Sequence, residues 1–174
     1  MKSRILAGTI TLLMLAGSLW ASDAPNATDS AAAFAQLKSL AGNWESKAPD
    51  GSKSRVRYEV VSAGSAVVEH FESDALGAAN AMLTVYYLDG GHLRLTHYCM
   101  AQNQPRMQAE SFDKSTGELR FAFLDATNLS GPEAGHMHNA AFRFIDADHF
   151  VADWQFFEGG KPKTTESLQY TRVR

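Results

Sequence analysis

Along most of the chain, apolar and polar residues alternate in short runs that are separated by Gly, Asp, Asn and Pro. Alternation with a period of two is typical of strands that bury one face, and the separating residues are typical of turns. The pattern predicts ten strands, whose ends are defined to within about two to four residues. They cover residues 42–47, 53–61, 65–73, 81–89, 92–101, 105–113, 117–125, 136–146, 149–158 and 162–172.

A different pattern precedes the first strand. Ala33, Phe34, Leu37 and Leu40 recur at spacings of three and four residues, which predicts a short amphipathic helix over residues 31–40. The chain that follows contains no other stretch of this kind. The fold is therefore expected to be all-β, with one short helix before the first strand.

The breaks between strands fall into short and long ones. Four are tight enough for hairpins, at residues 62–64, 90–91, 114–116 and 147–148, whereas residues 126–135 form a long break. If the strands run up and down in order, the tight turns lie at one end and the long loops at the other. Closure into a ten-stranded antiparallel barrel removes both sheet edges and leaves room for a small ligand. A two-sheet β-sandwich is the alternative fold.

The first residues have the features of an export signal. Lys2 and Arg4 precede an apolar stretch and then small residues, which predicts a secretory signal peptide over residues 1–21. The alternative is an uncleaved membrane anchor, although the apolar stretch is short against the about 20 residues that a span needs. Residues 22–30 then form a flexible tether and residues 31–174 a single domain. We expect an exported protein, periplasmic or secreted, with no transmembrane segment after cleavage.

Charge and cysteine content exclude some classes of protein. The chain has 16 Lys and Arg against 19 Asp and Glu, a formal charge of −3, and its basic residues are scattered, so nucleic acid is not expected as a partner. Removal of residues 1–21, which contain Lys2, Arg4 and no acid, changes the charge to −5. Cys99 is the one cysteine, which excludes an intramolecular disulfide framework.

Three residues define the end of the barrel that carries the tight turns. Gly42 and Trp44 open the first strand, and Arg172 lies near the end of the last strand, next to the first if the barrel closes. Arg172 can then cover the Trp44 ring in a cation–π contact, a structural role. This arrangement resembles the calycins, the superfamily of lipocalins and fatty-acid-binding proteins, in which a helix, a Gly-x-Trp and a late Arg close the barrel.

Within the calycins, the ten strands and the lack of lipocalin cysteines are similar to nitrobindin-type barrels and related exported bacterial domains. This likeness implies a haem ligand. However, the coordinating His of nitrobindins lies late in the chain, and the last strand here, residues 162–172, contains no His.

Polar residues gather toward the other end of the predicted barrel. Strand alternation gives His97 and Cys99 the inward face of one strand, and Asp125 and the pair His136 and His138 the inward faces of two others. Strand direction brings these positions to the end with the long loops. Met107 can join them, and the expected apolar wall of a ligand site is Phe121, Phe123, Phe142, Phe144 and Trp154. In the strand of Glu69 and His70, alternation does not decide which of the two faces inward.

This cluster leaves three interpretations open. Its members can hydrogen-bond the polar end of a ligand, or His97, Cys99, His136 and His138 can bind zinc or copper, or one of them can ligate haem. No nucleophile elbow, zinc-protease motif, phosphate loop or dinucleotide fingerprint occurs, so catalysis would depend on the same cluster and we do not expect it. The leading hypothesis is a barrel that binds a small apolar or amphiphilic molecule; a metal protein and a filled structural barrel are the alternatives.

Overall fold

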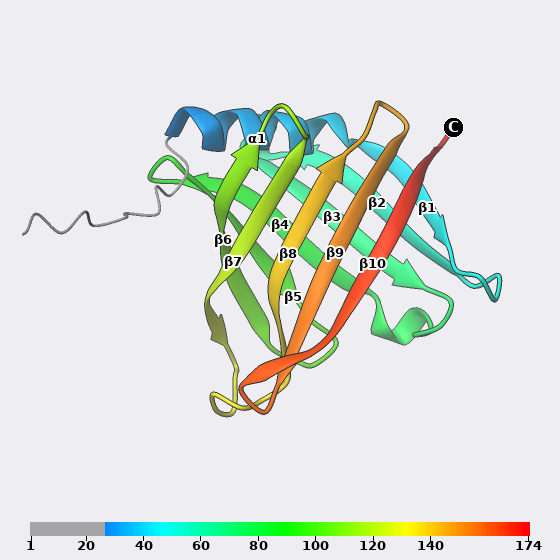
Figure 1. Ribbon diagram of the computed structural model, residues 1–174, viewed down its shortest axis with the longest axis vertical. Coiled ribbons are helices and arrows are strands. Elements are labelled where there is room, and N and C mark those ends of the chain that lie inside the picture. Colours follow the sequence, from blue (N-terminus) through cyan, green and yellow to red (C-terminus); the bar gives the residue numbers. More distant parts are fainter. Residues whose placement is uncertain (1–26) are drawn as a thin grey trace, which may run out of the picture.

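The computed structural model describes residues 27–174, which form one α-helix and ten β-strands (Figure 1). The predicted signal peptide and the first part of the predicted tether lie outside these residues. Helix α1 (Ala27–Ser39) comes first. The strands are β1 (Gly42–Lys47), β2 (Lys53–Val61), β3 (Ala66–Ser73), β4 (Met82–Asp89), β5 (His92–Tyr98), β6 (Gln104–Asp113), β7 (Glu118–Thr127), β8 (His136–Phe144), β9 (His149–Glu158) and β10 (Lys161–Val173).

The strands form one closed antiparallel barrel in which each strand pairs with its neighbours along the chain and β1 pairs with β10. The predicted all-β barrel of ten strands is confirmed, and no strand end differs from its expected position by more than three residues. The largest difference is at β5, which ends at Tyr98 because a turn begins at Cys99, whose N–H donates to the carbonyl of Asn103. No helix among residues 27–174 has the length and hydropathy of a bilayer-crossing segment.

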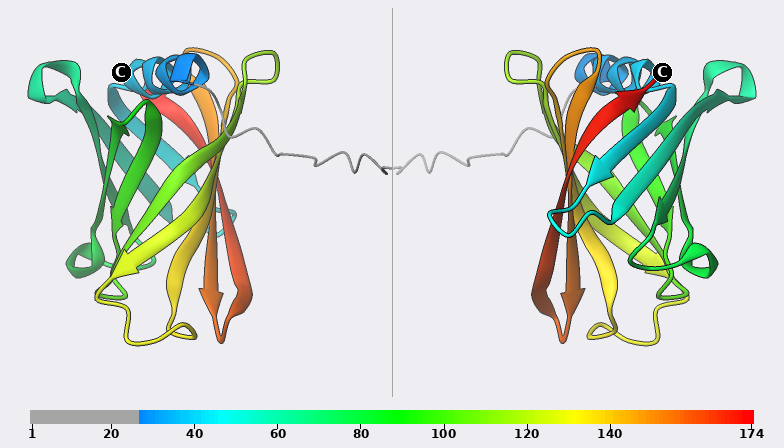
Figure 2. Two further views of the ribbon diagram at one scale, coloured as in Figure 1. Left: turned by 90° about the vertical axis from the view of Figure 1, so that its left-hand side faces the viewer. Right: turned by 90° about the vertical axis from the view of Figure 1, so that its right-hand side faces the viewer.

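Helix α1 covers the end of the barrel where the tight turns lie, as both views of Figure 2 show. Its apolar side, with Ala33, Phe34 and Leu37, is buried against the barrel. The helix begins at Ala27, within the segment expected to be a tether. Asp29 lies in the first turn, where a carboxylate is favourable to the helix dipole, and Lys114 of the β6–β7 turn pairs with it at 3.1 Å. These contacts extend the helix beyond its apolar periodicity.

The interior of the barrel near α1 is filled with side chains. The Trp44 and Phe150 rings meet edge to face at 4.8 Å, and Phe150 stacks on Tyr170 at 4.9 Å. One level further in, Tyr86 of β4 reaches across the barrel to Phe121 and Phe142 at about 6 Å. This half is therefore a packed core, and we call the opposite half, with the longer loops, the open half.

The predicted contact between Trp44 and Arg172 is confirmed. The guanidinium carbon lies 4.0 Å from the Trp44 ring centroid. Arg172 also donates to the carbonyls of Ser39, the last residue of α1, and of Ala41, so it caps the helix and covers the ring at once. Gly42 has φ +126°, and a Cβ there would lie 3.1 Å from the guanidinium, so glycine suits both the backbone and the close approach.

Candidate functional site

Four polar residues form a row across the inner wall, at right angles to the strands. Tyr58 of β2 is the cross-strand partner of Glu69 on β3, Glu69 of Thr84 on β4, and Thr84 of His97 on β5. Cross-strand partners share one face of a sheet, and all four side chains are buried. The row crosses from the packed core into the open half.

Glu69 is the charged member of this row. The hydroxyls of Tyr58 and Tyr86 both donate to its Oε2, at 2.8 and 2.6 Å, and neither bond uses Oε1. The side chain is 3% exposed, and burial raises the pKa of its carboxyl although the two hydroxyls oppose that rise. Burial, followed by the nearby carboxylate, also raises the pKa of both phenols. Glu69 thus faces inward, and its neighbour His70 lies outside near Glu59.

His97 is the member of the row with an unused polar atom. Its Nδ1 shares a 3.0 Å hydrogen bond with Oγ1 of Thr84, whereas its Nε2 is fully buried and has no hydrogen-bond partner among the described residues. Burial lowers the pKa of the ring to about 4, so the imidazole is neutral at physiological pH. The indole of Trp154, from β9 across the barrel, lies 5.0 Å away. A buried nitrogen of this kind is uncommon in a folded protein and needs an explanation.

The wall opens beside Trp154. Strand β1 pairs with β10 at three positions, Asn43, Trp44 and Glu45, so the first half of β10 has no partner on that side. Glu166 of β10 is the cross-strand partner of the buried Trp154 and so points to the same inner face, yet it is exposed. Partial burial raises the pKa of its carboxyl. The inner face of β10 is therefore exposed to solvent at Glu166.

His136 and His138 lie together at the seam between β7 and β8, where pairing ends at Phe121 and Ala140. Nδ1 of His136 donates to the Ala134 carbonyl at 2.7 Å, so its Nε2 accepts from Nδ1 of His138 at 3.0 Å. The His138 ring is stacked between two aromatic rings, with centroids 3.8 Å from Phe157 and 4.5 Å from Phe123. Burial and the neighbouring His136 lower the pKa of His138. The pair lies where β7 and β8 separate, and none of its hydrogen bonds or ring contacts among the described residues involves His97.

Asp125 does not join the predicted cluster. The pairing of β6 with β7 shifts between Arg106 and Met107, which leaves Leu124 unmatched and turns Asp125 to the outer surface. There its carboxylate binds the Arg106 guanidinium through both oxygens, at 2.5 and 2.6 Å. Alternation along β7 predicted the opposite face because one unmatched residue inverts it.

Cys99 lies in the turn after β5 and not on the strand. Its side chain is half-buried and packs against the hydrophobic core, and burial raises the pKa of its thiol. The five residues predicted to form one cluster therefore lie in several separate places. Residues 27–174 contain no group of three or more His, Cys, Asp or Glu arranged to hold a metal ion.

The remaining predicted wall residues divide between the core and the open half. Met107, Phe121, Phe142 and Phe144 are buried core residues, whereas Phe123 is half-buried in the stack with His138. Trp154 lies against His97, with their ring centroids 5.0 Å apart. Strand alternation does not single out Glu69 as a site residue, because Val67, Val68 and Phe71 give both faces of β3 apolar members.

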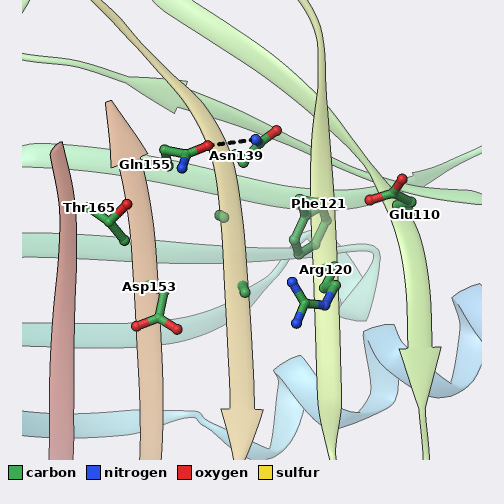
Figure 3. Close-up of a pocket in the computed structure, with 9 residues that line it drawn as sticks. Glu110, Arg120, Phe121, Asn139, Asp153, Gln155 and Thr165 are labelled. Carbon is green, nitrogen blue, oxygen red and sulfur yellow. Dashed lines mark hydrogen bonds between the residues drawn. The ribbon is translucent and has the colours of Figure 1, made fainter. Parts of the chain in front are cut away.

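A separate cavity of about 280 Å³ lies in the wall where β7 and β8 diverge (Figure 3). The side chains around it are mostly polar, and Nδ2 of Asn139 donates to Oε1 of Gln155 at 2.9 Å beside it. Phe121 is the one aromatic residue among those that line it. The sequence contained no sign of this cavity, because it depends on the end of pairing between β7 and β8.

Comparison with known proteins supports the fold alone. No protein-family model matches the chain, and no curated protein matches it. A similar solved structure is a protein of unknown function from the DUF3598 family of Nostoc punctiforme, with a TM-score of 0.53 and 12% sequence identity. The likeness covers 79% of this chain and 49% of that one, so this chain spans about half the length of its structural neighbour.

Proposed function

We propose that this protein binds a small, partly apolar molecule in the open half of its barrel. The observation that carries the proposal is the buried Nε2 of His97, which has no hydrogen-bond partner in the described part of the chain. A buried polar atom without a partner costs about 1–3 kcal/mol, and a ligand that hydrogen-bonds to it recovers this energy. Ligand sites in general combine apolar walls with a few such polar atoms.

The surroundings of His97 fit this role. Trp154 supplies an apolar surface 5.0 Å from the imidazole ring, and Glu166 of the neighbouring strand β10 belongs to the inner face but is open to solvent. We place the entrance for the molecule beside β10, where Glu166 is exposed. His97 and Trp154 belong to the residues that the sequence predicted as ligand-binding.

The base of the barrel supports a place for this chain among calycin-like barrels. Gly42, Trp44 and Arg172 have the contacts expected of that superfamily, in which barrels commonly hold ligands. We further propose, from the sequence of residues 1–21, that the protein is exported and meets its ligand in the periplasm or the medium.

The proposal is tested with the neutral fluorescent probe N-phenyl-1-naphthylamine and the purified mature chain. We expect saturable enhancement of probe fluorescence, with quenching of tryptophan emission that is lost in Trp154→Phe. Replacement of His97 by Leu should weaken probe binding at least fivefold, since the probe's N–H loses its acceptor. His149→Leu is the matched control, because His149 is exposed at the other end of the barrel and pairs with Asp146. Absence of saturable binding, or equal affinity in both variants, would contradict the proposal.

A further inference from the structure

Two side chains of the inner wall, those of Glu69 and His97, have polar atoms that a ligand can hydrogen-bond. Glu69 is a buried carboxylate whose Oε1 takes no part in the bonds from Tyr58 and Tyr86, and Nε2 of His97 has no hydrogen-bond partner among residues 27–174. Thr84 lies between them as the cross-strand partner of both. Glu166 adds a second carboxylate at the opening beside β10. A ligand beside these residues meets negative charge and, in the His97 tautomer with its proton on Nδ1, an acceptor at Nε2.

Among the residues that the structure describes, no Lys or Arg side chain lies on this part of the inner face. Alternation places Arg55 and Arg57 on the outer face on either side of the buried Val56, and Arg94 lies outside beside the buried Leu95. No Lys, Arg or His forms an ion pair with Glu69 or Glu166 within the described chain. Arg172 is on the inner side, but it lies at the closed base over Trp44.

A buried carboxylate without a cationic partner is costly, because two hydroxyl donors replace only part of its hydration. Three outcomes relieve that cost: protonation of Glu69, a water molecule, or a cation supplied by a ligand. Burial raises the pKa of Glu69, which agrees with a carboxylate that lacks a cation. A ligand ammonium bound to Oε1 would complete the hydrogen bonding of the carboxylate and neutralise its charge.

We propose that the ligand carries a protonated amine next to an apolar group, and that Glu69 binds the ammonium while His97 accepts a hydrogen bond and Glu166 attracts the cation at the entrance. This inference rests on the proposed function and adds the chemical class of the ligand. The apolar group lies against Trp154. An anionic ligand is disfavoured by both carboxylates.

The experiment compares three probes of similar size and different charge at pH 7.5: 2-phenylethylamine, 2-phenylethanol and 3-phenylpropionate, each titrated calorimetrically into the mature protein. We expect the amine to bind at least tenfold more tightly than the alcohol, and the carboxylate to bind most weakly. Glu69→Gln should weaken amine binding at least tenfold and alter alcohol binding less than twofold. Glu72→Gln is the matched control, an exposed position on the same strand.

Circular dichroism shows whether Glu69→Gln is folded. If it is not, Glu166→Gln decides, with an expected loss of about threefold in amine affinity, because this carboxylate is exposed. Equal affinity for amine and alcohol, or an unchanged amine affinity in folded Glu69→Gln, overturns the inference. If N-phenyl-1-naphthylamine still binds in that case, the ligand class is wrong and the binding function stands; if neither probe class binds, both proposals fail.

Discussion

The guanidinium of Arg172 lies over the ring of Trp44 and, from the same position, donates to the carbonyls of Ser39 and Ala41. One side chain from the last strand thus joins the first strand to the end of helix α1. Trp44 itself is 1% exposed and donates from Nε1 to the Leu40 carbonyl at 2.7 Å. These contacts hold the end of α1, the first strand and the last strand together at the base of the barrel.

Loss of the Trp44 ring should destabilise the barrel strongly. We expect Trp44→Ala to lower the free energy of unfolding by about 3–5 kcal/mol, because a large buried ring is removed and a hydrogen bond is lost. Arg172→Lys should cost about 1–2 kcal/mol, since lysine keeps the charge but cannot donate to the carbonyls of Ser39, Ala41 and Ala147 together. Urea unfolding measures the free energy of unfolding of both variants. A loss under about 0.5 kcal/mol, which is typical of surface substitutions, would contradict the structural role of that residue.

His97 should make the protein sensitive to acid. Its pKa falls from 6.5 to about 4 on folding because of burial, so between these values the unfolded chain binds the proton and the native one does not. Stability contributed by the neutral ring is present above pH 6.5 and is lost as the pH falls toward 4, by roughly 3 kcal/mol in all. His97→Gln should flatten this part of the pH dependence in chemical unfolding. A slope equal to that of wild type in His97→Gln would refute the assignment.

Glu69 should give the stability of the protein the opposite dependence on pH. The pKa of its carboxyl is raised in the folded protein by burial, so the native state binds the proton more tightly than the unfolded chain does. Stability therefore falls as the pH rises from the ordinary value of 4.5 through the raised value. We expect the melting temperature of Glu69→Gln, relative to wild type, to be more favourable at pH 7.5 than at pH 4. The same comparison with Glu72→Gln, at the surface, should show no such trend.

The thiol of Cys99 should react slowly with alkylating reagents in the folded protein. The side chain is half-buried and burial raises its pKa, so little thiolate is present at pH 7.5. We expect iodoacetamide to modify it at least tenfold more slowly in the folded protein than in urea, as followed by mass spectrometry. This low reactivity would allow one free cysteine in an oxidising compartment, and a folded-state rate equal to that in urea would show the thiol to be freely accessible.

The His136 and His138 pair gives a prediction that separates the seam from the binding site. The double replacement His136→Ala with His138→Ala removes the stack with Phe123 and Phe157, and we expect a loss of about 1–3 kcal/mol in unfolding free energy. Binding of N-phenyl-1-naphthylamine should weaken less than in His97→Leu. A greater loss of binding in the double variant, with the fold intact by circular dichroism, would place the site at the seam.

The sequence by itself determined the ten strands and the short helix, because period-two alternation and turn residues are local properties of the chain. It indicated the contact between Trp44 and Arg172 only on the condition that the barrel closes. It also indicated His97 and Trp154 as inner-wall residues. The tertiary structure decided that Asp125 faces outward, that Cys99 lies in a turn and that Glu69 accepts hydrogen bonds from two tyrosines. Register shifts and seams arise from pairing between strands, and one unmatched residue inverts a face; contacts across the interior depend on closure of the whole barrel.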